Sequence, residues 1–238
     1  SQKEHDYQDN IFEQYVRKSD IPEILKKHAV SLKYILSDKN FPLKETTLPD
    51  LCADRIDYSL RSSFAYGEIE SARSILANLT AENGRWIFKD FLSARQYAEL
   101  FLKLNKNYYA GLSSAVMLRT IGDYLRYALS KNYISEADLY TTDKIVLSKI
   151  EPYIKTDSEL ALIFERLNNK VGFRNDPDNY DAEVFCKSRA VDPLCYQDGK
   201  IKRISEIEPR WADIVREQLK PKVYFLKFDG FDITHHQS

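Results

Sequence analysis

Apolar residues recur at helical spacing through most of the chain up to about residue 168. In a helix, residues three and four positions apart lie on one face, so each such run predicts a helix with one buried side. A cap residue followed by an early proline predicts two helix starts, at Ser19 to Glu23 and at Thr47 to Asp50. Other helices are expected at Gly67 to Leu79, Asp90 to Asn105, Ser113 to Ser130, Thr142 to Ile150 and Thr156 to Leu167.

The pattern changes after Asn168. Residues 175–179 favour a turn, and the Asp-Gly pair at 198–199 favours a tight hairpin. Strands are expected at Val184 to Val191, Ile201 to Ile204 and Lys222 to Phe228, with a short helix at Pro209 to Leu219. We therefore predict a mainly α fold, with a helical core over residues 1–168 and a C-terminal α+β extension over residues 169–238 that contains a small sheet of about three strands.

The helix expected from Leu48 to Arg61 carries its reactive side chains along a single line. Four polar residues form this front: Asp54, Asp57, Tyr58 and Arg61. The opposite side is formed by Cys52, Ile56, Leu60 and Phe64. The pattern alone leaves two interpretations open. Asp57 and Arg61 can form an ordinary surface ion pair with Asp54 facing water, or the front can line a site.

The string LPDLCADRIDYSLR at residues 48–61 resembles the last metal-binding motif of the HD-domain metal-dependent phosphohydrolases. The likeness is to their deoxynucleoside triphosphate triphosphohydrolase branch, in which an Asp-[Arg/Lys]-x-Asp-Tyr-x-x-Arg-Asp run lies on a core helix. It is strong over these residues and weaker over most of the chain. The resemblance implies an HD-domain-like helical core for the first 168 residues.

The resemblance also implies a role for each matching residue. Asp54 falls at the position of the family's last metal-ligating aspartate, and Arg55 at that of a basic residue that contacts the substrate's phosphates. Tyr58 falls where a tyrosine packs on the deoxyribose. Asp57 and Arg61 match positions that fix the motif helix to its neighbours or line the pocket. Asp54 and Arg55 are thus the implied catalytic residues.

The chain departs from the family pattern at two points. Ser62 stands where the family usually has an aspartate that reads a sugar hydroxyl, so the preferred sugar stays open. The family holds its divalent ion, for which Mn, Mg, Fe or Zn are the candidates, with a His, a His-Asp doublet and the late Asp. Here the one doublet, His5-Asp6, is expected to be a terminal loop, and the other histidines stand at 28, 235 and 236. The chain is then either the C-terminal piece of a longer enzyme or a degenerate member that does not chelate metal.

Two basic residues fall on the strand expected at Val184 to Val191. Lys187 and Arg189 project from one side of that strand, while Cys186 and Ser188 project from the other. In the resembling family, basic residues on such a strand face nucleotide phosphates at an active or allosteric site. The alternative is a solvated edge strand protected by charges.

Composition narrows the partners and the compartment. Basic and acidic residues nearly balance, 35 against 36, so no overall field attracts nucleic acid and no sequence-specific nucleic-acid binding is expected. The three cysteines, at 52, 186 and 195, are scattered, which indicates a reducing compartment, cytoplasmic or nuclear. The sequence contains no run of eighteen apolar residues, so it predicts no membrane span.

Three functions are consistent with these features. The first, implied by the resemblance, is a metal-dependent phosphohydrolase that in its intact form acts on a nucleoside (deoxy)triphosphate or a related phosphate ester, as a homo-oligomer. The second is a catalytically inactive nucleotide-sensing or scaffold module. The third is an unrelated helical interaction protein, which an exposed Asp54 and a merely superficial Asp57–Arg61 pair would favour.

Overall fold

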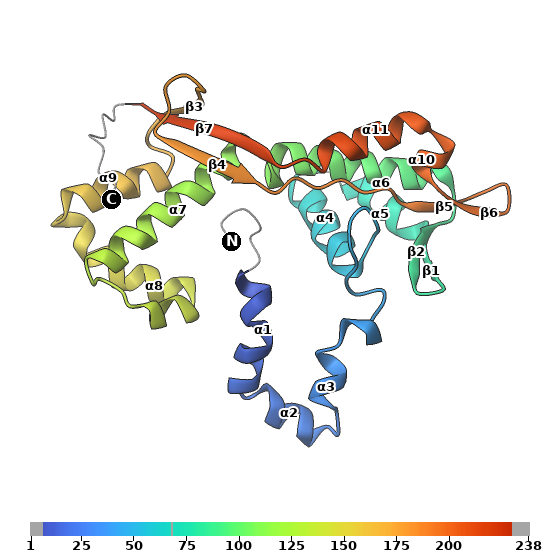
Figure 1. Ribbon diagram of the computed structural model, residues 1–238, viewed down its shortest axis with the longest axis horizontal. Helices are drawn as coiled ribbons and strands as arrows, with labels where there is room; N and C mark the ends of the chain where they lie inside the picture. The colour runs from blue at the N-terminus through green and yellow to red at the C-terminus, as the bar shows by residue number, and fades with distance from the viewer. Residues whose placement is uncertain (1–6, 68, 230–238) are drawn as a thin grey trace. The chain divides into compact units, whose positions relative to one another are not determined.

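The computed structural model describes residues 7–67 and 69–229, and helices make up most of them (Figure 1). The fold class is therefore mainly α with small sheets, as predicted. The described chain forms two compact units. The first contains the residues up to Ala110 together with Lys187–Lys222, and the second contains Gly111–Cys186 together with the residues from Val223 onward.

The first unit is built around one buried helix, α6. Its residues Tyr97, Phe101 and Leu104 are fully buried, and helices α4, α5 and α10 pack against it. The helices of this unit are α1 (Tyr7–Lys18), α2 (Ile21–Lys27), α3 (Leu32–Ile35), η1 (Asp38–Asn40), α4 (Ala53–Ala65), α5 (Ile69–Ala77), α6 (Phe91–Leu104), η2 (Asn105–Tyr109), α10 (Ile204–Ile207) and α11 (Pro209–Gln218). Of these, η2 is a π-helical turn that continues directly from α6.

A four-stranded sheet in the order β1-β2-β5-β6 completes the first unit. Its strands are β1 (Leu79–Glu82), β2 (Arg85–Phe88), β5 (Leu194–Gln197) and β6 (Lys200–Arg203). Two tight hairpins join them in pairs, and each turn has Gly as its second residue, with both central residues at positive φ: Asn83-Gly84 and Asp198-Gly199. Asn-Gly and Asp-Gly favour this geometry, because glycine adopts positive φ without steric cost. β2 and β5 pair in parallel and join the two hairpins into one sheet.

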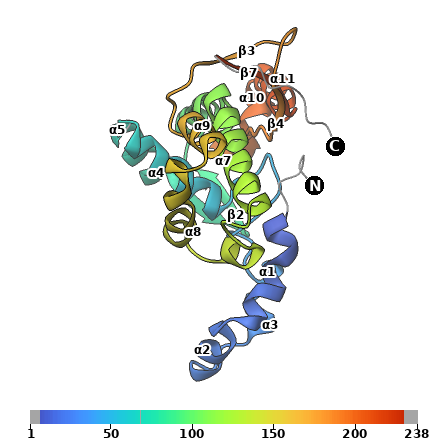
Figure 2. The ribbon, with the colours of Figure 1, turned by 90° about the vertical axis from the view of Figure 1, so that its left-hand side faces the viewer.

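The second unit has its own helices, sheet and core. Its helices are α7 (Leu112–Ser130), η3 (Glu136–Tyr140), α8 (Asp143–Ile150), η4 (Glu151–Lys155) and α9 (Ser158–Leu167). Figures 1 and 2 both show α9 alongside α7. The strands β3 (Phe173–Asn175), β7 (Lys222–Phe228) and β4 (Ala182–Cys186) form a sheet in that order. A separate core gathers Tyr124, Ala128, Ile134, Val146, Ile150 and Leu160.

Several expected elements are confirmed. The helices expected at residues 90–105, 113–130, 142–150, 156–167 and 209–219, the hairpin turn at 197–200 and the strand at 222–228 all occur within a few residues of their expected bounds. The prediction of one small sheet is wrong, because the strands belong to two sheets in different units. The strand expected at Val184 to Val191 is also wrong in its second half, since β4 ends at Cys186. The division at residue 168 and the HD-domain identity of the core stay predictions.

The motif helix begins later than expected, at Ala53 rather than near Leu48. Residues 48–52 form a turn and an extended stretch before it. The backbone N–H groups of Ala53 and Asp54 donate to the carbonyl oxygens of Leu43 and Lys44 (2.7 and 3.4 Å). These contacts satisfy two of the amides that the first turn of a helix leaves without intrahelical partners. The preceding loop thus fixes where α4 starts.

Candidate functional site

Asp54 lies in the first turn of α4, where a carboxylate interacts favourably with the helix dipole. Its side chain is exposed, and no described residue forms an ion pair or hydrogen bond with its carboxylate. This exposure is one half of the observation expected for an unrelated helical protein. It also leaves the carboxylate available to a ligand.

Arg55 is buried, with 8% of its surface exposed. Its guanidinium donates to the carbonyl oxygens of Asp50 (2.6 Å) and Thr46 (3.2 Å), and it lies 3.5 Å from the Glu45 carboxylate. Arg55 therefore holds the loop that precedes α4. The phosphate contact implied for Arg55 stays untested, and the structure gives its guanidinium a different task.

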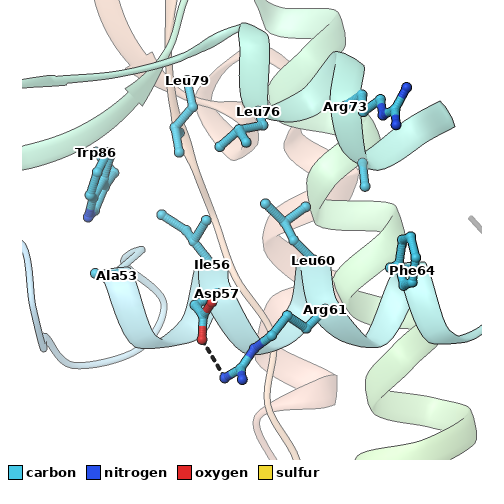
Figure 3. A pocket seen from close by; sticks show the side chains of 11 residues that line it. Ala53, Ile56, Asp57, Leu60, Arg61, Phe64, Arg73, Leu76, Leu79 and Trp86 are labelled. Atoms are coloured by element: carbon cyan, nitrogen blue, oxygen red, sulfur yellow. Dashed lines mark hydrogen bonds and ion pairs between the residues drawn. The ribbon is translucent and has the colours of Figure 1, made fainter. Parts of the chain in front are cut away.

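Asp57 and Arg61 form an ion pair of 2.5 Å on the surface of α4, with both side chains more than half exposed. The pair borders an apolar groove of about 630 Å³ between α4, α5 and the β1–β2 hairpin (Figure 3). Figure 3 shows Ile56 and Leu60 pointing from α4 toward Leu76 and Leu79. Phe64, expected on the buried side of the helix, is 64% exposed at the end of this groove, so that expectation is wrong.

Tyr58 lies on the other flank of α4 and is packed among aromatic rings. Its ring and that of Tyr109 form a T-shaped pair with centroids 5.3 Å apart, and the centroid of Phe101 lies 6.1 Å away. Burial raises the pKa of Tyr58 to about 12, and the charge of Arg189 opposes that rise. The hydroxyl oxygen of Tyr58 is buried and has no hydrogen-bond partner among the described residues. Leaving such a group unpaired costs about 1–3 kcal/mol, so it is an unusual feature that a ligand can relieve.

Arg189 and Lys187 lie in the stretch that follows β4, and the structure separates their surroundings. Lys187 is exposed, Ser188 is buried and Arg189 is half-buried. The charge of Arg189 lowers the pKa of both Tyr58 and Tyr109, partly offsetting the effect of burial. No described carboxylate pairs with Arg189. The charge of Arg189 therefore acts on Tyr58 and Tyr109, whereas the Lys187 side chain is exposed.

The predicted front of α4 thus divides into two flanks. We call Asp54, Tyr58 and Ser62, with Tyr109 and Arg189 beside them, the Tyr58 flank. The Tyr109 hydroxyl donates to Ser62 Oγ (2.8 Å), so the position where the family has an aspartate is here tied to a tyrosine. Burial raises the pKa of Tyr109, and this phenol stays protonated at neutral pH.

The spacing of residues along the chain does not indicate the contribution of the π-helical turn after α6. Tyr109 lies in this turn and reaches Ser62, and Asn105 at its start contacts the stretch that carries Arg189. The sequence offered one signal, the two asparagines at 105 and 107 before Tyr108 and Tyr109, because asparagine is a weak helix former.

The described residues do not fit a complete divalent-metal site. Within residues 7–67 and 69–229, no three His, Cys, Asp or Glu side chains stand together in a way that could hold an ion. Asp54 by itself does not make such a site, because structural and catalytic ions take three or more protein ligands or share the ion with substrate phosphates. His5, Asp6, His235 and His236 lie outside the described residues.

The geometry defines a mainly α protein in which an acidic and aromatic flank of α4 is joined by an arginine from the stretch after β4. The chain belongs to the same family as the uncharacterized protein YdhJ of Bacillus subtilis. The two are 30% identical over 225 residues, which cover 92% of this chain and 69% of YdhJ. No family model matches the chain.

Two further proteins are similar over part of their length. A metal-dependent phosphohydrolase, cns2 of Cordyceps militaris, is 34% identical over 101 residues, 40% of this chain and 27% of cns2. The crystal structure of a hypothetical protein from Aquifex aeolicus has a similar fold, with a TM-score of 0.59 and 15% identity over 90% of this chain and 66% of that chain. No described helix is both long and apolar enough to cross a membrane.

Proposed function

We propose that the chain is part of a metal-dependent phosphohydrolase and that its Tyr58 flank, with Arg189, binds the phosphate ester. The substrate class we propose is a nucleoside (deoxy)triphosphate or a related ester. The partial match to cns2, whose name states this activity, supports the class of reaction. The motif at residues 48–61 supports the place on the molecule. Homo-oligomer formation and a cytoplasmic or nuclear location stay predictions.

The observation that carries this proposal is the half-buried Arg189, whose charge acts on Tyr58. Arg189 is half-buried, no described carboxylate neutralises it, and its charge acts on two phenols. A guanidinium donates two parallel hydrogen bonds to a phosphate, and such charge-assisted bonds are stronger where water is partly removed. An uncompensated arginine in this setting is a natural place for an anion.

Each residue of the flank then has a distinct task. Arg189 holds a phosphoryl group and neutralises charge that gathers on it. Tyr58 keeps its proton at neutral pH, because its pKa is about 12, so its hydroxyl can donate to an ester oxygen while the ring packs against the sugar. Asp54, one helical turn earlier, offers an exposed carboxylate. We derive no step through a metal ion, because the described residues do not provide a complete site for one.

A catalytically inactive nucleotide-sensing module is the second candidate. The lack of a ligand cluster among the described residues favours it, and so does the Ser62–Tyr109 hydrogen bond at the position of the family's aspartate. The exposed Asp54 and the surface pair Asp57–Arg61 match what an unrelated helical protein predicts. The charge of Arg189 near Tyr58 and the similarity to a phosphohydrolase argue against an unrelated helical protein.

Phosphate release and metal content, measured together, test the proposal. The purified chain and the longer relative YdhJ are each supplied with Mn²⁺, Mg²⁺, Fe²⁺ or Zn²⁺ and a panel of nucleoside monophosphates and triphosphates. We expect release from at least one nucleotide by one of the two proteins, with bound metal found by elemental analysis in the active one. If neither protein hydrolyses any nucleotide but both bind one, the sensing module replaces the enzyme. If neither binds a nucleotide, both candidates are wrong.

A further inference from the structure

Asn105 is a fully buried polar residue at the point where α6 passes into the π-helical turn η2. A buried amide side chain is costly unless its donor and acceptor are both satisfied. Its backbone carbonyl accepts from Ala110 N (2.8 Å) and closes the turn. Single π-helical turns within helices are frequent at functional sites, because they displace the side chains that follow.

The side chain of Asn105 is occupied by the stretch that carries Arg189. Its Oδ1 accepts from the backbone N–H of Arg189 (3.0 Å), and its Nδ2 donates to Ser188 Oγ (2.9 Å). The next two residues, Ala190 and Val191, are buried in the core of the first unit. The backbone of Arg189 is therefore fixed at its amide by Asn105 and on its far side by packing.

The same residue thus fixes two parts of the Tyr58 flank. It anchors the backbone of Arg189 directly, and it starts the turn that carries Tyr109 to Ser62. Tyr58 interacts with both of them, because its ring forms a T-shaped pair with Tyr109 and the charge of Arg189 acts on its phenol.

We propose that Asn105 is the positioning residue for Arg189, and that its neutral amide holds this arginine ready for the phosphate of a ligand. The inference rests on the proposed function, and it adds a residue that neither the motif nor the comparisons assign. The amide of Asn105 carries no charge, and this matters for anion binding. An aspartate at this position keeps an acceptor for the Arg189 amide, and the Ser188 hydroxyl can turn to donate to it, but its charge competes with a bound anion for the guanidinium.

The test uses the whole chain, with pyrophosphate in metal-free buffer as the probe and two measurements. Calorimetry gives the dissociation constant of pyrophosphate, and hydrogen exchange followed by mass spectrometry gives the exchange rate of the peptide that contains residues 187–191. Arg189→Gln removes the guanidinium itself, and we expect it to weaken pyrophosphate binding by about 10- to 100-fold. Ser59→Ala is the matched control, because Ser59 is fully buried in the same unit and its hydroxyl hydrogen-bonds Ile56 and Tyr97 (3.1 and 3.0 Å), neither of which belongs to this stretch.

Asn105→Leu removes both hydrogen bonds, and we expect about 5- to 20-fold weaker pyrophosphate binding with exchange of the 187–191 peptide at least about 10-fold faster. Asn105→Asp separates position from charge: exchange stays slow while affinity falls. If Asn105→Leu does not fold, Ser188→Ala removes only one bond and is expected to give an affinity loss of about 2- to 5-fold with intermediate exchange. Ser59→Ala changes neither readout.

Each contrary result has a distinct meaning. If Arg189→Gln weakens binding while Asn105→Leu, or Ser188→Ala in its place, binds like the wild type, Asn105 does not position Arg189 and the proposed function stands. If exchange of the 187–191 peptide is unchanged by these variants, the positioning role is also overturned. If Arg189→Gln binds pyrophosphate as well as the wild type, the proposed phosphate site is wrong and the inference falls with it.

Discussion

The two flanks of α4 differ in the contacts that they make with the rest of the first unit. Asp57 and Arg61 pair with one another in water beside an open apolar groove, and neither is fixed by another element. Tyr58 and Ser62 meet Tyr109 from the π-helical turn, and Arg189 comes from a distant part of the sequence. The contrast between the two flanks shows that reactive residues along one helical stripe do not all belong to one site. The neighbouring elements decide which part of it is buried and charged.

The largest expected effect is on turnover and comes from Asp54. Asp54→Asn removes the charge of an exposed carboxylate that no described residue pairs with, so only its interaction with the helix dipole is lost and stability should fall by less than about 1 kcal/mol. If the Tyr58 flank is a phosphohydrolase site, kcat/KM for nucleotide hydrolysis should fall by at least about 100-fold. Phosphate release and the thermal midpoint measure the two effects. Full activity in Asp54→Asn would remove Asp54 from the site.

The next effect is on stability and concerns Arg55. Arg55→Ala leaves the carbonyl oxygens of Asp50 and Thr46 without their donor beneath the start of α4, which should cost about 2–4 kcal/mol of unfolding free energy. Urea denaturation measures the loss. Arg55→Lys retains a single donor group and should lose less. A stable Arg55→Ala variant with impaired turnover would instead restore the implied phosphate contact.

A smaller effect, of opposite sign, is expected for Tyr58. Tyr58→Phe removes a buried hydroxyl that has no partner among the described residues, so the free energy of unfolding should stay unchanged or rise by about 1 kcal/mol. Binding of a phosphate ester should weaken in the same variant, because the ester loses a donor. Urea denaturation and calorimetry measure the two. Clear destabilisation by Tyr58→Phe would mean that the hydroxyl has a partner in solution.

The smallest effect belongs to the other flank. Arg61→Ala breaks an ion pair in which both side chains are more than half exposed, and such pairs contribute little. We expect the free energy of unfolding to change by less than about 0.5 kcal/mol, as measured by urea denaturation. A loss above about 1.5 kcal/mol would show that this flank is more firmly built than the structure indicates.

Local chemistry made much of the fold predictable. The helices from residue 90 to 167 follow from apolar spacing, and Asp198-Gly199 predicts its hairpin because glycine suits the turn. The start of α4 was not predictable from its cap signal, because residues 43 and 44 and the Arg55 side chain hold the preceding loop. The strand expected through Val191 ends at Cys186. Beyond that residue, the backbone N–H of Arg189 donates to the side chain of Asn105 and not to a neighbouring strand.

The site was predictable only in part, for the same reason. The motif singled out Asp54 and Tyr58, and the basic pair at 187 and 189 was noted separately. Spacing along a chain cannot show that Arg189 approaches Tyr58, or that Ser62 hydrogen-bonds Tyr109. Both contacts depend on the π-helical turn after α6, whose existence no hydrophobic pattern indicates.

Affinity for pyrophosphate in two arginine variants tests the account most directly. Arg189→Gln and Arg73→Gln each remove one positive charge near α4, the first at the Tyr58 flank and the second at the apolar groove. We expect Arg189→Gln to weaken binding by about 10- to 100-fold and Arg73→Gln to change it by less than about 2-fold. Equal loss in the two variants, or no loss in Arg189→Gln, would contradict the claim that the Tyr58 flank is the phosphate site.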